Sequence, residues 1–285
     1  MMGEPRSGAR YIGTARPDVA LKIVQMVTST SLSIKDLHEA ISKDLGLVMR
    51  TLRLANSAAY GLPRKVENME RAVVLLGARA IGNIALAASM ESTFNAFPAE
   101  VTSLDGKRLQ IHALAVARAA EMICRYANVG LAAGEAFIAG LLHDIGMLAS
   151  AWADPQGFET WMLRRKTDGV LAPEIEREYV GLDHAEEGMK IGIEWGLPPS
   201  ICLAIGYHKR PLDTLEHSLL VSAVALAHYI TGDIAGWEID GSGANPAAVR
   251  KLLNRVGFAA EDWESLIGTI RPRLATPPEE AARVN

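Results

Sequence analysis

The sequence predicts an all-α fold in which an N-terminal helical lobe packs on a second helical lobe. Apolar residues recur at helical spacing along most of the 285-residue chain, and the clear two-residue alternation that would indicate strands is absent. Capping residues, glycines and prolines divide this pattern into segments. With 49% hydrophobic and 22% charged residues, the composition is typical of a globular protein rather than a disordered one.

The first well-marked helical segment is predicted to begin at residues 33–36, which fit a capping box. Residues 45–55 keep one face of it apolar. The segment is expected to end near residues 60–63, because a glycine followed by a proline is a helix stop. Close to this end, Asn56 and Ser57 are expected to make local capping or turn hydrogen bonds. Contact with the second lobe or with a partner is the alternative.

A second long helical segment is predicted over residues 72–88. Gly77 and Gly82 lie within it and would allow neighbouring helices to approach closely. Residues 95–105 have a more broken pattern, and we predict the boundary between the two lobes there.

Helical patterns continue beyond this boundary, and proline-containing breaks separate the shorter ones. The long segments are 109–126, 135–150 and 215–230. Residues 241–245 are predicted to form a loop, and the polar, proline-rich tail from Arg271 is predicted to fray.

His143 and Asp144 interrupt a nearly continuous apolar helix within Ala139–Gly146. Adjacent helix positions are about 100° apart, so both side chains can reach one point beside the helix. Burying an unpaired polar or charged group costs several kcal/mol. The pair therefore needs partners, which either a metal ion or hydrogen-bonded neighbours would supply.

Three further histidines, His112, His208 and His228, occupy the apolar stripes of their own segments. His184 begins another helix, with Asp183 as its N-cap and a glutamate three residues after the cap closing a capping box. A single histidine on an apolar face is most often a hydrogen-bonded core residue, but five such histidines are harder to explain one by one. Facing helices build metal sites from imidazole and carboxylate ligands. A shared hydrogen-bonded core and a metal centre both remain open.

These residues resemble the HD superfamily of metal-dependent phosphohydrolases, and their order is most similar to that in its HD-GYP branch. Motifs in the N-terminal half make the resemblance more specific, since they are similar to those of the HDOD domain. The matching motifs are Leu52–Gly61 (LRLANSAAYG), Ala72–Gly77 (AVVLLG), Asp183–Glu186 (DHAE) and Trp195–Pro198 (WGLP). The resemblance covers roughly residues 15–230. It implies an all-α fold, with an N-terminal helical lobe packed on an HD-type helical lobe, in a bacterial signalling or regulatory protein.

The resemblance also divides the chain into four parts. Residues 1–14 would be a flexible N-terminus, and residues 15–100 the N-terminal helical lobe of the HDOD domain. Residues 101–232 would form the HD-like lobe, and residues 233–285 a C-terminal helical extension and tail. No sensor or response-regulator module is expected within the chain.

A set of metal ligands is implied by the same resemblance. Its members are His112, His143, Asp144, His184, His208 and His228. Imidazole and carboxylate ligands together suit iron, manganese, nickel or zinc, so the implied cofactor is one divalent metal of this group.

Several departures from the HD-GYP pattern bear on catalysis. Met147 stands where those enzymes have a lysine, and a thioether cannot supply that charge to a phosphate. Lys209 replaces the second histidine of a His-His pair, and no Gly-Tyr-Pro motif follows it. His228 replaces a closing aspartate and adds no negative charge. The ligand frame is therefore retained while the catalytic machinery is damaged.

We therefore expect a signal-transduction module that acts through a protein partner and lacks robust catalysis, and we assign no catalytic residue. The alternative is a phosphodiesterase-like, metal-dependent phosphohydrolase that uses the residual HD site and a metal-activated water.

The remaining expectations concern location and partners. Residues 1–10 lack the apolar core of a secretory signal, and no stretch approaches the ~20 apolar residues of a membrane span. Cys124 and Cys202 lie in apolar helical patterns and are expected to be reduced thiols of a cytoplasmic protein. The net charge of −4 is not the positive excess that favours direct binding of nucleic acid. The oligomeric state stays open.

Overall fold

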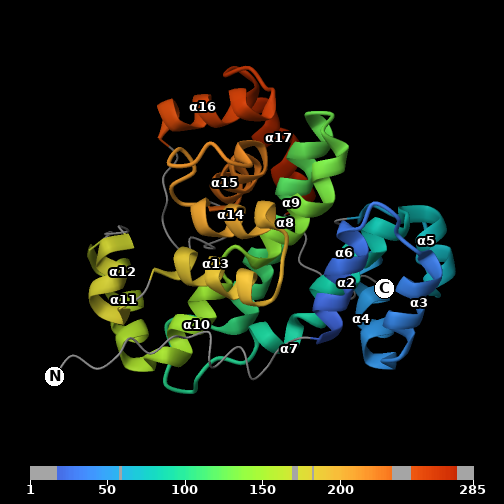
Figure 1. The fold of residues 1–285 in the computed structure, drawn as a ribbon, viewed down its shortest axis with the longest axis horizontal. Coiled ribbons are helices and arrows are strands. Elements are labelled where there is room, and N and C mark those ends of the chain that lie inside the picture. Colours follow the sequence, from blue (N-terminus) through green and yellow to red (C-terminus); the bar gives the residue numbers. More distant parts are fainter. Residues whose placement is uncertain (1–17, 58–59, 169–172, 182, 233–244, 275–285) are drawn as a thin grey trace.

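The computed structural model describes residues 18–57, 60–168, 173–181, 183–232 and 245–274. Every regular element in these ranges is a helix, which confirms the all-α prediction. Figure 1 shows two lobes joined side by side. The expected flexible N-terminus, most of the predicted loop at 241–245 and most of the tail lie outside the described residues.

The N-terminal lobe is a cluster of short helices around α6. Its members are α2 (Asp18–Thr28), α3 (Ile34–Ser42), α4 (Leu45–Ala55), α5 (Met69–Leu76), α6 (Ala78–Ser89) and α7 (Glu91–Phe94). Helices α2 to α5 all contact α6. A Cβ on Gly82 would lie only 2.1 Å from Val27 Cγ1, so the predicted close approach at this glycine is present between α6 and α2.

Both long segments predicted for this lobe are broken in the structure. The first divides into α3 and α4, because Asp44 accepts a hydrogen bond from Leu47 N at 3.0 Å and caps a new helix. The second divides at Gly77, whose φ of 86° is open to glycine but strained for other residues. Gly77 is therefore a helix break and not a site of helix contact.

Asn56 ends α4 earlier than predicted and connects to a distant part of the chain. Its Oδ1 accepts from Val66 N at 2.7 Å, and its Nδ2 donates to Val66 O at 2.8 Å. The side chain thereby closes the loop that follows α4. Its hydrogen bonding reaches across ten residues of chain and is less local than the sequence indicated.

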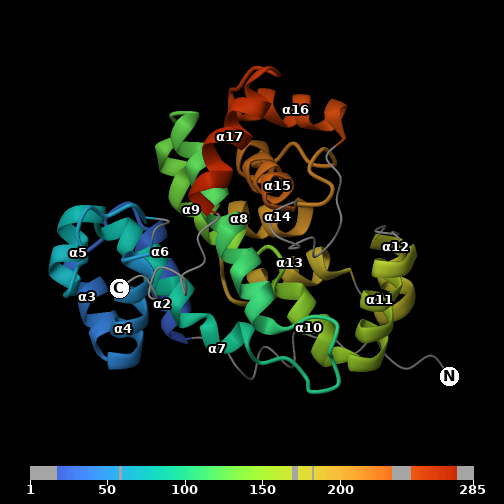
Figure 2. The same cartoon turned by 180° about the vertical axis from the view of Figure 1, so that it is seen from behind.

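The second lobe contains the remaining helices. They are α8 (Gly106–Tyr126), α9 (Gly130–Leu142), α10 (Ile145–Ala153), α11 (Pro155–Asp168), α12 (Pro173–Val180), α13 (His184–Glu194), α14 (Pro199–Tyr207), α15 (Ser218–Gly232), α16 (Pro246–Val256) and α17 (Asp262–Leu274). Helix α8 packs on α9, α15 and α17, and α9 contacts α2 and α6 of the first lobe. Figure 2 shows α8 running through the middle of the molecule. The tail predicted to fray from Arg271 is helical as far as Leu274.

Residues 132–153 are long and apolar enough to cross a membrane, but 94% of the 18-residue apolar part of this stretch is buried inside the protein. It is the core of the second lobe and not an outer helix. A Cβ on Gly140 would lie 2.8 Å from Ala117 Cα, so α9 and α8 touch backbone to backbone. The predicted continuous helix ends at Leu142 and restarts at Ile145, which places His143 and Asp144 at a junction.

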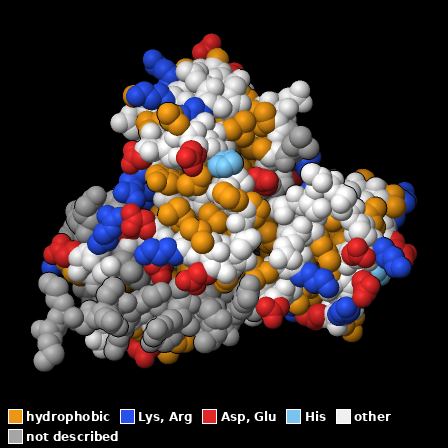
Figure 3. Space-filling view, viewed as in Figure 1, with side chains coloured by type: hydrophobic (Ala, Val, Ile, Leu, Met, Phe, Trp, Pro, Cys, Tyr) orange, Lys and Arg blue, Asp and Glu red, His pale blue; other side chains and the backbone are white. Residues whose placement is uncertain are grey.

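The surface carries charges of both signs. On the face seen in Figure 3, Lys and Arg side chains alternate with Asp and Glu side chains, and hydrophobic side chains gather near α13 and α14. Cys124 and Cys202 are both buried and free, and burial raises the pKa of the Cys124 thiol to about 12.

Candidate metal centre

The six residues predicted as ligands meet at one buried point of the second lobe. They come from α8 (His112), the α9–α10 junction (His143 and Asp144), the start of α13 (His184), the end of α14 (His208) and α15 (His228). Each is at most 1% exposed. The other two histidines, His38 and His217, are exposed and stand apart.

Glycines allow the helices around this point to approach closely. A Cβ on Gly146 would lie 1.9 Å from the carbonyl oxygen of His184. A Cβ on Gly188 would lie 2.9 Å from Ile205 Cγ2. Helices α10, α13 and α14 can therefore bring their polar residues together only because these positions lack side chains.

Two of the imidazoles have fixed tautomers. His143 Nδ1 lies 2.8 Å from Gly140 O, and His208 Nδ1 lies 2.7 Å from Ile205 O. A carbonyl oxygen only accepts, so each Nδ1 carries the proton and donates. In the neutral ring, each Nε2 then holds a lone pair that points into the centre, as a metal ligand requires. Burial lowers the pKa of His208 to about 3, although Asp144 opposes the shift.

A third imidazole, that of His184, is oriented by Glu176 of α12. Its Nδ1 donates to Glu176 Oε2 at 2.6 Å, and its backbone N–H donates to Oε1 at 3.1 Å. Glu176 is 2% exposed. No sequence pattern indicates this residue's role, because Glu176 and His184 belong to different helices and the contact exists only once the chain brings α12 to the start of α13.

Asp183 caps α13 as predicted, with Oδ1 accepting from Ala185 N at 2.9 Å. The glutamate expected to close the capping box is bound elsewhere. Glu186 accepts from Arg177 at 2.5 Å and from Arg210 at 3.1 Å. These ion pairs connect α12, α13 and the segment after α14 on the outer side of the centre.

The Asp144 carboxylate lies in the middle of the cluster. Its Oδ1 is 3.5 Å from the Nε2 atoms of His184 and His208, and its Oδ2 is 3.1 Å from His143 Nε2. Burial alone would raise the pKa of Asp144, but the surrounding imidazoles, His143 foremost, hold it well below its ordinary value. This lowering requires positive charge on the imidazoles. Where the rings are neutral, their lone pairs face the carboxylate, and a cation between them would supply the same charge.

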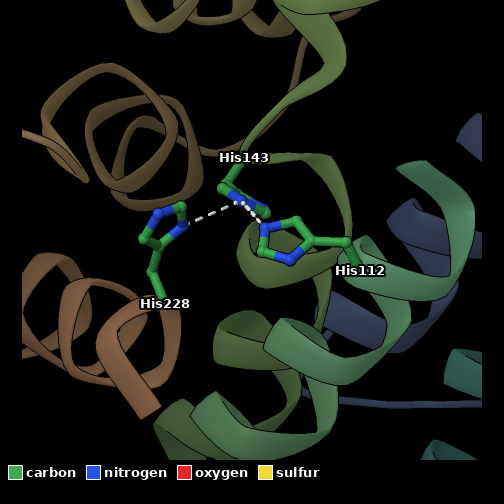
Figure 4. A group of neighbouring side chains, drawn as sticks. All are labelled: His112, His143 and His228. Carbon is green, nitrogen blue, oxygen red and sulfur yellow. Dashed lines mark hydrogen bonds between the residues drawn. The ribbon is translucent and has the colours of Figure 1, made fainter. Parts of the chain in front are cut away.

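The Nε2 atom of His143 has two more neighbours (Figure 4). His112 Nε2 and His228 Nδ1 each lie 3.2 Å away. One lone pair accepts one good hydrogen bond, so hydrogen bonds among these three ring nitrogens do not satisfy all of them. Among the described residues, both Asp144 oxygens and the Nε2 atoms of His184 and His208 have no hydrogen-bond partner. The nitrogen and oxygen donors present therefore fit a divalent metal.

The residues that depart from the HD-GYP pattern lie close by. Met147 is fully buried on α10, one turn after Asp144. Lys209 is partly buried directly after His208 and has interaction partners of its own. His228 joins the cluster itself.

Comparison with known proteins places this geometry in a family. The HDOD domain model matches residues 14–211. An uncharacterized protein of Treponema pallidum is 26% identical over 220 residues. The match covers 74% of this chain but only 40% of the length of that relative.

Two solved structures share the fold over nearly the whole chain. An HDOD domain protein of unknown function from Geobacter sulfurreducens has a TM-score of 0.78 at 20% identity, covering 97% of this chain and 98% of the other. A protein from Shewanella amazonensis named as a candidate phosphohydrolase has a TM-score of 0.73 at 22% identity, covering 99% and 100%. Since the family model spans well over half of the sequence, the chain belongs to the HDOD domain family.

Proposed function

We propose that this HDOD protein is a signal-transduction module that acts on a protein partner, and that its buried centre holds one divalent metal without robust catalysis. Family membership supports a regulatory role. A structure from Marinobacter aquaeolei named as a candidate signal transduction protein has a TM-score of 0.76 to this chain at 20% identity, covering 94% of this chain and 58% of that one.

The observation that carries this proposal is the burial of the centre. None of its six residues is more than 1% exposed. A catalytic metal needs a coordination position that substrate can reach, whereas a metal closed off by protein ligands supports structure. Met147 adds to this argument, because a thioether replaces the positive charge that would stabilise a phosphoryl transition state.

The chain's own residues would hold the metal in a defined way. Gly140 and Ile205 carbonyls fix the protons of His143 and His208, and Glu176 does the same for His184. When bound, the metal would supply a positive charge that neutralises Asp144. It would also cross-link five segments of the second lobe, and so stiffen the surface offered to a partner.

The test combines metal analysis with hydrolysis assays. Wild-type protein and His143→Ala are loaded separately with iron, manganese, nickel and zinc, and bound metal is measured by elemental analysis. We expect about one metal per wild-type chain and a large loss in the variant. Neither protein should hydrolyse bis(p-nitrophenyl) phosphate or cyclic dinucleotides above the rate of free metal. Turnover that His143→Ala abolishes would contradict the proposal.

A metal-dependent phosphohydrolase is the second candidate function. The observation in its favour is the retained donor set around Asp144, since a metal bound there can activate water. The Shewanella amazonensis structure named as a candidate phosphohydrolase adds support from its fold alone. Lys209→His, which restores the second histidine of the HD-GYP pattern, separates the two functions. If the protein is a phosphohydrolase, wild type should be active and Lys209→His should increase that activity.

A further inference from the structure

A second polar site lies between the two lobes, away from the buried centre. It is a cavity of about 550 Å³, which lies within the usual size range of small-molecule sites. Its lining comes from both lobes: the loop after α4, helices α5 and α6, helix α8, and the end of α17. A molecule bound there would contact both lobes at once.

The cavity combines positive charge with an apolar wall. Arg118, Arg125 and Arg273 line it together with a single carboxylate, that of Glu121, so the lining carries three positive charges and one negative charge. The apolar part of the lining consists of Leu75, Leu76, Ala80 and Met122.

Glu121 is neutralised by its own neighbours. Arg118 Nη1 donates to its Oε2 at 2.6 Å, and Arg125 donates to its Oε1 from Nε at 3.2 Å and from Nη2 at 2.8 Å. The Glu121 side chain is only 4% exposed, whereas that of Arg125 is 59% exposed. The carboxylate therefore holds the two guanidinium groups in position, and these three side chains together keep one net positive charge in the cavity lining.

Two tyrosines, Tyr60 and Tyr126, also belong to the cavity lining. The Arg118 guanidinium lies 4.1 Å from the centroid of the Tyr60 ring, which fixes the loop after α4 against α8. Arg273 donates to the hydroxyl of Tyr126. Burial raises the pKa of Tyr60, so its hydroxyl remains a neutral hydrogen-bond donor.

From this arrangement we propose that the cavity binds a phosphate ester of about mononucleotide size. Guanidinium groups bind phosphate through paired N–H donors, and the apolar wall with two tyrosines accepts a planar ring. The proposal does not depend on the buried metal centre, because it uses none of the same residues.

The test is calorimetric titration of the full chain with adenosine monophosphate and with inorganic phosphate. We expect saturable binding of the nucleotide in the millimolar range or tighter, and weaker binding of phosphate alone. Arg273→Glu should weaken nucleotide binding by about tenfold or more, since it removes a charged hydrogen bond to the phosphate and places a negative charge beside it. Arg250→Glu, the same charge change at an exposed position of α16, is the matched control and should have little effect.

A steric variant keeps every charge and tests the cavity itself. Ala80→Trp fills the space beside the apolar wall, and should abolish nucleotide binding while circular dichroism shows an unchanged fold. Absence of nucleotide binding to wild type overturns the proposal. Equal weakening by Arg273→Glu and Arg250→Glu, or phosphate binding as tight as nucleotide binding, also overturns it. Metal content is measured in the same samples, so a failed centre and a failed cavity are distinguished.

Discussion

Nδ1 of His184 lies 2.6 Å from Oε2 of Glu176, and both side chains are buried. This contact fixes the imidazole proton on the outer nitrogen and leaves Nε2 as a ligand that faces Asp144. The orientation of one candidate ligand thus depends on a glutamate that touches no other residue of the cluster within hydrogen-bonding distance.

Replacement of Glu176 by alanine should weaken metal binding by about 10–100-fold, the usual effect of losing a carboxylate that orients a metal-bound histidine. Glu176→Gln keeps an acceptor oxygen and should lose less. Competition against a chromophoric chelator measures both affinities. Glu178→Ala changes an exposed glutamate of the same helix and is the control. Equal affinities of wild type and Glu176→Ala would show that Glu176 does not orient a metal-bound His184.

We predict that metal reverses the order of stability between wild type and Asp144→Asn. Without metal, Asp144→Asn should be at least as stable as wild type, because an amide N–H can donate to the lone pairs of His184 and His208 that the carboxylate faces. With metal at about 100 times its Kd, wild type should gain about 2.7 kcal/mol, and the variant should gain much less.

Urea unfolding with and without added metal measures this reversal. Asp213→Asn, at an exposed aspartate outside the cluster, should show the full gain from metal. Should Asp144→Asn gain as much as wild type, the carboxylate takes no part in metal binding.

The contact between α10 and α13 depends on the absence of a side chain at Gly146. A Cβ there would lie 1.9 Å from the carbonyl oxygen of His184, and the backbone of α13 would have to shift. Gly146→Ala should therefore lower the free energy of unfolding by about 1–3 kcal/mol, and should reduce metal content because His184 moves with α13.

Gly134 of α9 supplies a matched control, since a Cβ there meets no atom within 4 Å. Alanine is the better helix former by about 0.8–1 kcal/mol, so Gly134→Ala should stabilise the protein. Thermal unfolding of the two variants measures both effects. A Gly146→Ala protein as stable as wild type would show that α10 and α13 do not pack as described.

Four of the five cluster histidines could be picked out from the sequence because each interrupts an apolar helical stripe, and burying a polar group there demands a partner. His184, at the start of a helix, was marked by its capping residue and by the family resemblance instead. The break at His143–Asp144 was not predictable. The residues on both sides are uniformly apolar, and helical periodicity gives no sign of a junction within such a run.

Glu176 and the cavity arginines show a different limit of sequence reasoning. Glu176 acquires its role only when the chain brings α12 to the start of α13. Arg273 reaches Tyr126 across 147 residues of chain. Contacts of this kind depend on tertiary packing, and the spacing of residues along the sequence does not indicate them.

Glu159 leads to a prediction about pH. Its carboxylate accepts four hydrogen bonds from the backbone and hydroxyl groups of Thr102 and Ser103, at 2.7–3.0 Å. Burial opposes the shift, but these bonds lower the pKa of Glu159 from 4.5 to about 2. A carboxyl group with a depressed pKa in the folded state contributes stability that is fully present above pH 4.5 and is lost as the pH falls towards 2.

The difference in unfolding free energy between wild type and Glu159→Gln should therefore be constant near neutral pH and should shrink as the pH falls below 4.5. The side chain is partly exposed, so solvent screening keeps the difference modest. Denaturant unfolding across this pH range measures it, with Glu194→Gln at an exposed position of α13 as the control. A difference that stays constant or grows on acidification would show that the four hydrogen bonds do not favour the ionised carboxylate. The connection between the segment before α8 and α11 would then depend on packing instead.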